Sequence, residues 1–114
     1  MNQNKSDYID ERDALNRIGG KLDLYQTLLL RFVEGNQLDK LESALELGNI
    51  SEALRIAHTI KGVAANLSLI KLAAASKQLE LLIKDELDYL PKLDELKQIY
   101  GQTEQIILRD YCSR

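Results

Sequence analysis

Apolar residues recur at intervals of three and four along most of the chain, and no stretch alternates residue by residue as a β-strand would. This spacing predicts helices over about residues 10–18, 21–34, 36–47, 49–67, 70–87 and 91–111. Glycines or glycine-asparagine pairs separate the first four. Because short links favour antiparallel neighbours, we expect an all-α fold: an antiparallel up-down four-helix bundle with one or two short extra N-terminal helices, in a single domain over residues 1–114.

Capping and helix-breaking residues set the ends of these helices. Asn36 and Asn49 are predicted N-caps, and Asn49 followed by Glu52 resembles a capping box. Gly101 should weaken the last helix locally. Residues 1–8 are polar and are expected to be flexible.

The helix over residues 49–67 carries the only histidine of the chain, His58, and has two distinct faces. On helical geometry its core face is apolar and consists of Ala53, Ile56, Ile60, Val63, Ala64 and Leu67. The opposite face consists of Ser51, Leu54, Arg55, His58, Lys61, Gly62 and Ala65. The inner face predicted for the next helix is Leu72, Ala75, Ser76, Leu79, Leu82, Ile83 and Glu86. The imidazole is therefore expected to face solvent beside two positive charges.

Two residues next to this histidine are informative. Lys61 and Gly62 lie one turn beyond His58, where helical side chains come into contact. A glycine inside a helix costs about 1 kcal/mol relative to alanine, so Gly62 indicates a need for space beside the imidazole. Ala65 keeps the surface low one turn further on. A second protein surface can therefore come close to the ring.

The segment from Ala57 to Leu67, with the sequence AHTIKGVAANL, resembles the signature of histidine-containing phosphotransfer (HPt) domains. The similarity covers most of the chain and continues at Gly19–Tyr25, Leu29, Phe32 and Leu79-Glu80. Ser68 stands where the family usually has a glycine. The resemblance implies a phosphorelay intermediate, whose histidine accepts a phosphoryl group from one receiver-domain aspartate and donates it to another in two-component signal transduction.

The resemblance also implies roles for individual residues. His58 would be the phosphoacceptor, and Lys61, with Arg55 as the weaker candidate, would stabilise the added negative charge. The apolar contact surface for the partner would be Leu54, Gly62 and Ala65. The implied partners are receiver domains of response regulators or of a hybrid sensor histidine kinase, which would supply the aspartate, a metal ion and most of the catalysis.

Two sets of polar residues on the next helix are interpreted differently. Gln78 or Glu80 could orient the second ring nitrogen of His58 by a hydrogen bond. The lysines Lys71, Lys77 and Lys84 are interpreted as a solvated face rather than as part of a site.

Composition narrows the possible functions. A formal net charge of -3 argues against a general nucleic-acid binder. The chain has no glycine-rich phosphate loop for ATP, and one histidine with one cysteine are too few soft ligands for a metal site. No apolar run approaches the roughly 20 residues that span a bilayer, and the polar start does not resemble a signal peptide. Cys112 is the only cysteine and cannot form an internal disulfide, which suits a reducing compartment. We expect a cytoplasmic monomer that needs no cofactor or metal and does not insert into membranes.

Two other classes of function remain open. A non-catalytic helical interaction module could bind a receiver or another partner through the same patch, although such a module needs neither His58 nor Lys61. An enzyme using His58 as a general base lacks a recognisable second catalytic group, and the patch is expected to be convex, without a pocket. The carrier role, without an enzyme activity of its own, is the leading hypothesis.

Overall fold

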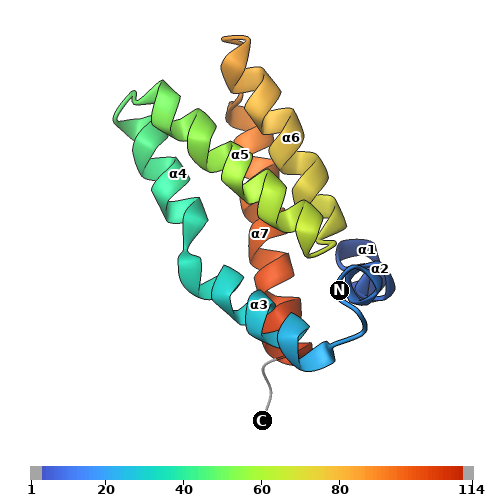
Figure 1. Ribbon diagram of the computed structural model, residues 1–114. Helices are drawn as coiled ribbons and strands as arrows, with labels where there is room; N and C mark the ends of the chain where they lie inside the picture. Colours follow the sequence, from blue (N-terminus) through green and yellow to red (C-terminus); the bar gives the residue numbers. More distant parts are fainter. Residues whose placement is uncertain (1–3, 112–114) are drawn as a thin grey trace.

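Seven helices make up the computed structural model, which describes residues 4–111 (Figure 1). They are α1 (Lys5–Tyr8), α2 (Glu11–Arg17), α3 (Leu22–Gly35), α4 (Gln37–Glu46), α5 (Ile50–Asn66), α6 (Ile70–Lys84) and α7 (Leu90–Asp110). Within the described residues, the extended pairing is limited to one isolated antiparallel bridge between Ile9 and Leu69. Cys112 lies outside the described residues.

The helices from α4 to α7 lie side by side, and consecutive helices run in opposite directions (Figure 1). Short turns join them, so that α4 packs on α5, α5 on α6 and α6 on α7. Helix α3 packs against α7, and α1 contacts α6. The all-α bundle predicted from the sequence is confirmed, α1 and α2 are its two short N-terminal helices, and the arrangement of α4 to α7 is consistent with the expected antiparallel bundle.

One hydrophobic core connects these helices, and it orients α5. On the predicted core face of α5, the buried residues are Ala53, Ile56, Ile60, Ala64 and Leu67. Val63 is only partly buried, because it lines a surface groove between α3 and α5. Packing of this face against the bundle fixes which way the opposite face points.

The end of α6 differs from the sequence prediction. The helix ends at Lys84, and Glu86 adopts a left-handed conformation with φ of 57°. The amide N of Leu87 bonds to the carbonyl oxygen of Leu82 at 3.0 Å, the pattern of a Schellman helix end. The prediction that Glu86 belongs to the inner face of α6 is therefore wrong, because the chain has already left the helix and Glu86 is exposed.

The two asparagines predicted as N-caps behave differently. Asn49 caps α5, since its side-chain oxygen accepts a hydrogen bond from the amide of Glu52 at 3.2 Å. Asn36 links α3 to α4 in a left-handed conformation, with φ of 52°, and makes no capping bond. Its side-chain amide instead donates to Asp39 at 2.9 Å. Asn36 therefore occupies the N-cap position of α4, as predicted, but its side chain does not cap the free amides.

The N-terminal segment contains helix α1, and the end of this helix packs against the rest of the bundle. Tyr8 and Ile9 are buried, at 7% and 2% exposure. The hydroxyl of Tyr8 bonds to Gln102 of α7, and the Nζ of Lys71 lies 4.4 Å from the centre of the Tyr8 ring. Residues 1–8 are mostly polar, but they include Tyr8, whose aromatic ring packs into the bundle. Residues 1–3 lie outside the described part.

Because Tyr8 anchors this segment, we expect Tyr8→Ala to lower the free energy of unfolding by about 2–4 kcal/mol, the usual cost of truncating a buried large side chain. Urea unfolding followed by circular dichroism measures the change. Leu24→Ala is the matched control, because Leu24 is 43% exposed and should lose less than about 1 kcal/mol. Equal effects of the two substitutions would contradict an anchoring role for Tyr8.

Polar contacts hold the corner between α5 and α6. Ser68 has φ of 56°, a left-handed conformation that favours glycine, and its hydroxyl donates to a carboxylate oxygen of Asp13 at 2.7 Å. The hydroxyl of Tyr25 donates to the carbonyl oxygen of Leu67 at 2.7 Å. The serine is tolerated at this corner because its side chain gains a bond that glycine could not make. These contacts fix the C-terminal end of α5.

Candidate functional site

His58 lies near the middle of α5, on the face directed away from the core, and its side chain is 68% exposed. The ring is therefore open to solvent, as its helical position predicts. The rest of α5 explains the orientation, because Ala57 and Ile60 on either side of it are buried and leave His58 only the outward direction.

Glu80 of α6 contacts both His58 and Lys61 of α5. Its Oε2 lies 3.1 Å from His58 Nδ1, and its Oε1 lies 2.8 Å from Lys61 Nζ. An ionised carboxylate can only accept hydrogen bonds, so Nδ1 is the ring nitrogen that carries the hydrogen. The lone pair of Nε2 is then available at the solvent side. Glu80 thus determines which nitrogen can act as a nucleophile.

The Glu80 carboxyl remains ionised despite partial burial, with 20% of its side chain exposed. Burial raises its pKa, but the hydrogen bonds from Lys61 and His58 outweigh this effect, and the pKa lies below its usual value. A lowered pKa means that the ionised form is stabilised in the folded protein. The carboxylate is therefore ionised at neutral pH and can accept both hydrogen bonds.

Arg55, the weaker candidate for charge stabilisation, is held by its own ion pair. Its Nε and a terminal guanidinium nitrogen donate to the two carboxylate oxygens of Glu52 at 2.7 and 2.8 Å. Lys61, in contrast, is joined to the carboxylate that also binds His58. Of the two cations, Lys61 is therefore the one linked to the imidazole, through the Glu80 carboxylate.

The three small or apolar residues predicted to contact a partner lie on the same helix as His58. Leu54 and Gly62 are partly buried and Ala65 is exposed. Apart from the adjacent residues and the backbone of its own helix, a Cβ atom added at Gly62 would meet no atom within 4 Å. No contact with another described part of the chain therefore requires a glycine at that position.

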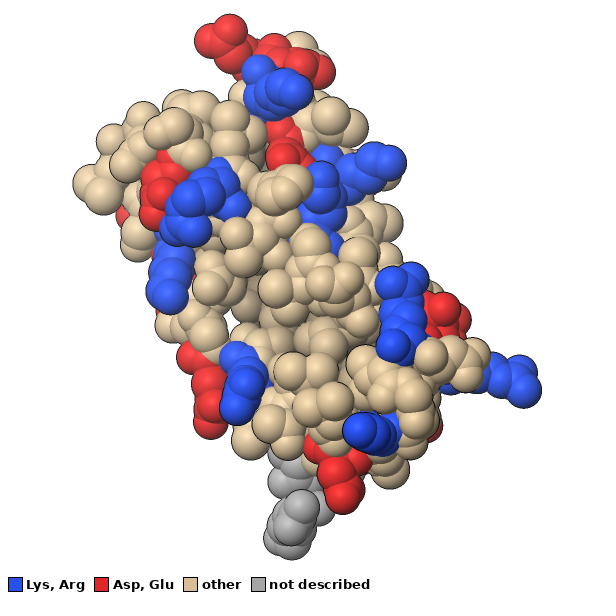
Figure 2. All heavy atoms as spheres, viewed as in Figure 1, with Lys and Arg blue, Asp and Glu red and all other residues tan. Residues whose placement is uncertain are grey.

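A groove of about 390 Å³ flanks this patch between α3 and α5, where a convex surface was expected. Its walls are mainly apolar and include Leu28 and Phe32 of α3 and Thr59 and Val63 of α5, with Arg31 at its edge. In Figure 2 the centre of this face carries few charged groups, with lysine and arginine side chains around it. The groove forms where α3 diverges from α5, a feature that helical periodicity does not reveal.

Gly62 and Gly101 form a matched pair for testing the need for space, because neither would place an added Cβ within 4 Å of another atom. Helix α7 continues through Gly101 without a break. We expect Gly62→Ala and Gly101→Ala each to stabilise the protein by about 0.5–1 kcal/mol in urea unfolding. For the phosphoryl transfer that the resemblance implies, we expect Gly62→Leu to lower the rate by about tenfold or more, since a small displacement of the reacting groups is costly, and Gly101→Leu to leave it unchanged. Equal transfer rates for the two leucine variants would contradict the clearance role of Gly62.

Within residues 4–111, no group of three or more His, Cys, Asp or Glu side chains is placed to hold a metal ion. A search of the same residues for a helix long and apolar enough to cross a membrane found none. Of the two residues proposed to orient the imidazole, Glu80 makes the contact, and Gln78 is exposed on α6.

Comparison with protein families gives one match: the family model described as Hpt domain covers residues 32–106, more than half of the chain. The matched range includes the helices that carry His58, Lys61 and Glu80. No curated protein and no solved structure gives a significant match.

Proposed function

Because this chain belongs to the Hpt domain family, whose members carry phosphoryl groups in two-component phosphorelays, we propose that His58 is its phosphoacceptor and that the protein passes the group between receiver domains. The single observation that carries this assignment is the imidazole of His58, which is exposed and bonded through Nδ1 to Glu80. This geometry leaves Nε2 accessible to a phosphoryl donor.

The transfer step follows from that geometry. The lone pair of Nε2 attacks the phosphorus of a receiver's aspartyl phosphate, so that an N–P bond forms while the P–O bond to the aspartyl carboxylate breaks. The electron pair of the broken bond stays on the aspartate, and the ring becomes an imidazolium that still carries its hydrogen on Nδ1. The Glu80 carboxylate, 3.1 Å away, stabilises this positive ring. The reverse sequence donates the group to a second receiver.

The contribution of this chain is positioning and charge compensation, which dominate phosphoryl transfer. In this proposal the receiver supplies the aspartate, the metal ion and most of the catalysis. Lys61 lies one turn from His58 on the same face, where its ammonium group can exchange part of its bond to Glu80 for the phosphoryl oxygens. The surface that receives the partner comprises Leu54, Gly62, Ala65 and the neighbouring groove between α3 and α5. We place the protein in the cytoplasm, where receiver domains act, and expect it to act as a monomer.

The test uses receiver domains loaded with radiolabelled phosphate by acetyl phosphate. We expect label to move to this protein and to be lost in acid but kept in base, the behaviour of a phosphoramidate and not of a phosphoester. Acid-stable label, or receivers that bind without any transfer, would contradict the carrier function. The second of these results would favour the non-catalytic interaction module.

A further inference from the structure

The positive side chains around His58 fall into two groups. Arg55 and Lys61 each form an ion pair, with Glu52 and Glu80 respectively. Lys77 and Lys84 of α6 form no ion pair within residues 4–111, and both are exposed. The charge of the first group is largely cancelled in the isolated protein, whereas the second group still presents its charge to solvent.

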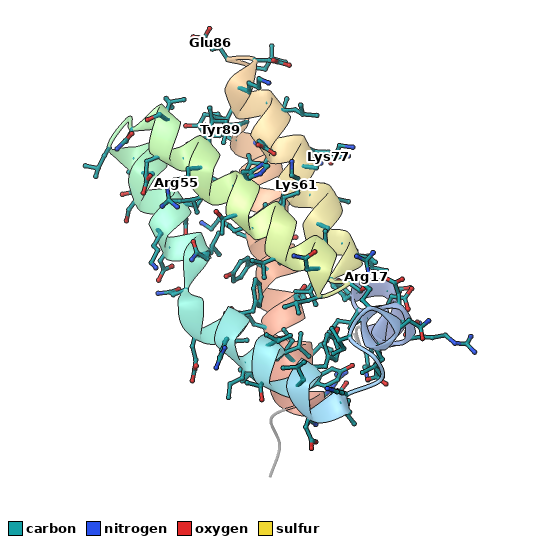
Figure 3. The ribbon with its side chains drawn as sticks, in the orientation of Figure 1. Arg17, Arg55, Lys61, Lys77, Glu86 and Tyr89 are labelled. Carbon is teal, nitrogen blue, oxygen red and sulfur yellow. The ribbon has the colours of Figure 1, made fainter. Side chains whose placement is uncertain are left out.

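Lys77 is brought to the edge of the site by the packing of α6 on α5. Glu80 binds His58 and Lys61 across this helix pair, and Lys77, three residues earlier on α6, lies on the same face as Glu80. Figure 3 shows Lys77 on α6 at about the level of Lys61 on α5, with its side chain extending outward from α6. An unpaired ammonium group thus projects into solvent at the edge of the phosphoacceptor patch.

The surroundings distinguish Lys77 from Lys84. Lys84 is the last residue of α6 and is followed by the exposed carboxylates of Asp85, Glu86 and Asp88, which weaken its field. Lys77 has no acidic neighbour in sequence before Glu80, which already accepts bonds from two other residues. Lys71, six residues earlier on α6, has its ammonium group above the Tyr8 ring. Among Lys71, Lys77 and Lys84, Lys77 is therefore the lysine of α6 whose charge is least compensated by its described surroundings.

We propose that Lys77 is a docking residue, which binds carboxylates on the receiver surface around the aspartate that exchanges the phosphoryl group. This role rests on the proposed function. Lys77 would help to select the receiver domain that docks at His58. A receiver must bring its phosphorylated aspartate to His58, and the negative charge of that group and of nearby carboxylates is complementary to an uncompensated lysine at the rim. Such complementarity mainly accelerates association.

The experiment measures transfer by rapid quench, from the receiver domain that labels wild-type protein fastest. We expect Lys77→Glu to lower the second-order rate constant by about tenfold at low ionic strength and to leave the maximal rate at saturating receiver unchanged. The difference should shrink as ionic strength rises from about 0.02 to 0.3 M, because salt screens exposed charges. Lys21→Glu is the control: it makes the same change in net charge at an exposed position at the start of α3 and should alter the rate constant by less than about twofold.

Three results would overturn the role of Lys77: a rate constant for Lys77→Glu equal to that of Lys21→Glu, a fall in the maximal rate alone, or a Lys84→Glu effect as large as that of Lys77→Glu. Failure of the proposed function is recognised separately, by the absence of transfer to wild-type protein. In that case equilibrium binding of the same receiver domains to His58→Gln protein, with and without Lys77→Glu, decides the docking role. Binding that is unaffected by Lys77→Glu would overturn it.

Discussion

Replacing His58 with glutamine is expected to reduce phosphoryl acceptance to background while leaving the fold and receiver binding intact. The amide of glutamine has no nucleophilic lone pair comparable to that of Nε2, so the N–P bond cannot form. His58 is 68% exposed and contributes nothing to the core, so the free energy of unfolding should change by less than about 0.5 kcal/mol. Thermal unfolding and receiver binding by calorimetry check the second part, and transfer of radiolabel checks the first.

A matched substitution outside the partner surface makes the result specific. Thr27→Ala removes an exposed hydroxyl on α3 that donates to the backbone carbonyl of Asp23 within the same helix. We expect Thr27→Ala to accept label at close to the wild-type rate. Label retained by His58→Gln, or lost equally in both variants, would contradict the assignment of His58 as the acceptor.

The second large effect is expected from Glu80→Ala. The substitution removes the partner that keeps the hydrogen on Nδ1 and that stabilises the imidazolium formed during transfer. A hydrogen bond to a charged group contributes about 1.5–3 kcal/mol, which corresponds to roughly 10- to 160-fold in rate. Because His58 is well exposed, water compensates in part, and we expect a loss near the lower end, about tenfold. Single-turnover transfer at saturating receiver measures it.

Glu80→Gln separates the hydrogen bond from the charge. The glutamine carbonyl can still accept from Nδ1, but it carries no negative charge for the imidazolium or for Lys61. We expect a rate between those of wild type and Glu80→Ala. A rate for Glu80→Ala equal to that of wild type would show that the contact has no part in transfer.

The lowered pKa of Glu80 predicts the pH dependence of its contribution to stability. The folded state binds the proton of this carboxyl less tightly than the unfolded state does, so the stabilisation is fully present above the ordinary glutamate pKa of about 4.3 and is lost as the pH falls through the lower folded-state value. The difference in free energy of unfolding between wild type and Glu80→Gln should therefore be constant near neutral pH and shrink in acid. A difference that grows on acidification would contradict this assignment.

Local sequence was sufficient for the helices and for the orientation of His58. The three- and four-residue spacing of apolar side chains decides which face of α5 is buried, and Ile56 and Ile60 on that face direct His58 to solvent. Lys61 and Gly62 lie beside the imidazole because they are three and four residues away on the same helix. These features depend on neighbours in the chain, so they could be predicted without knowing the fold.

Contacts between distant segments were decided only by the tertiary structure. Helical periodicity left Gln78 and Glu80 as equal candidates, and the packing of α6 on α5 selects Glu80, which joins His58 to Lys61. The same packing places Lys77 at the rim of the site, where the sequence indicated only a solvated face. The packing of the N-terminal segment depends in the same way on the contact between Tyr8 and α7. The physical reason is that helix rotation and register, which bring such side chains within bonding distance, are set by the whole core and not by the spacing along any one helix.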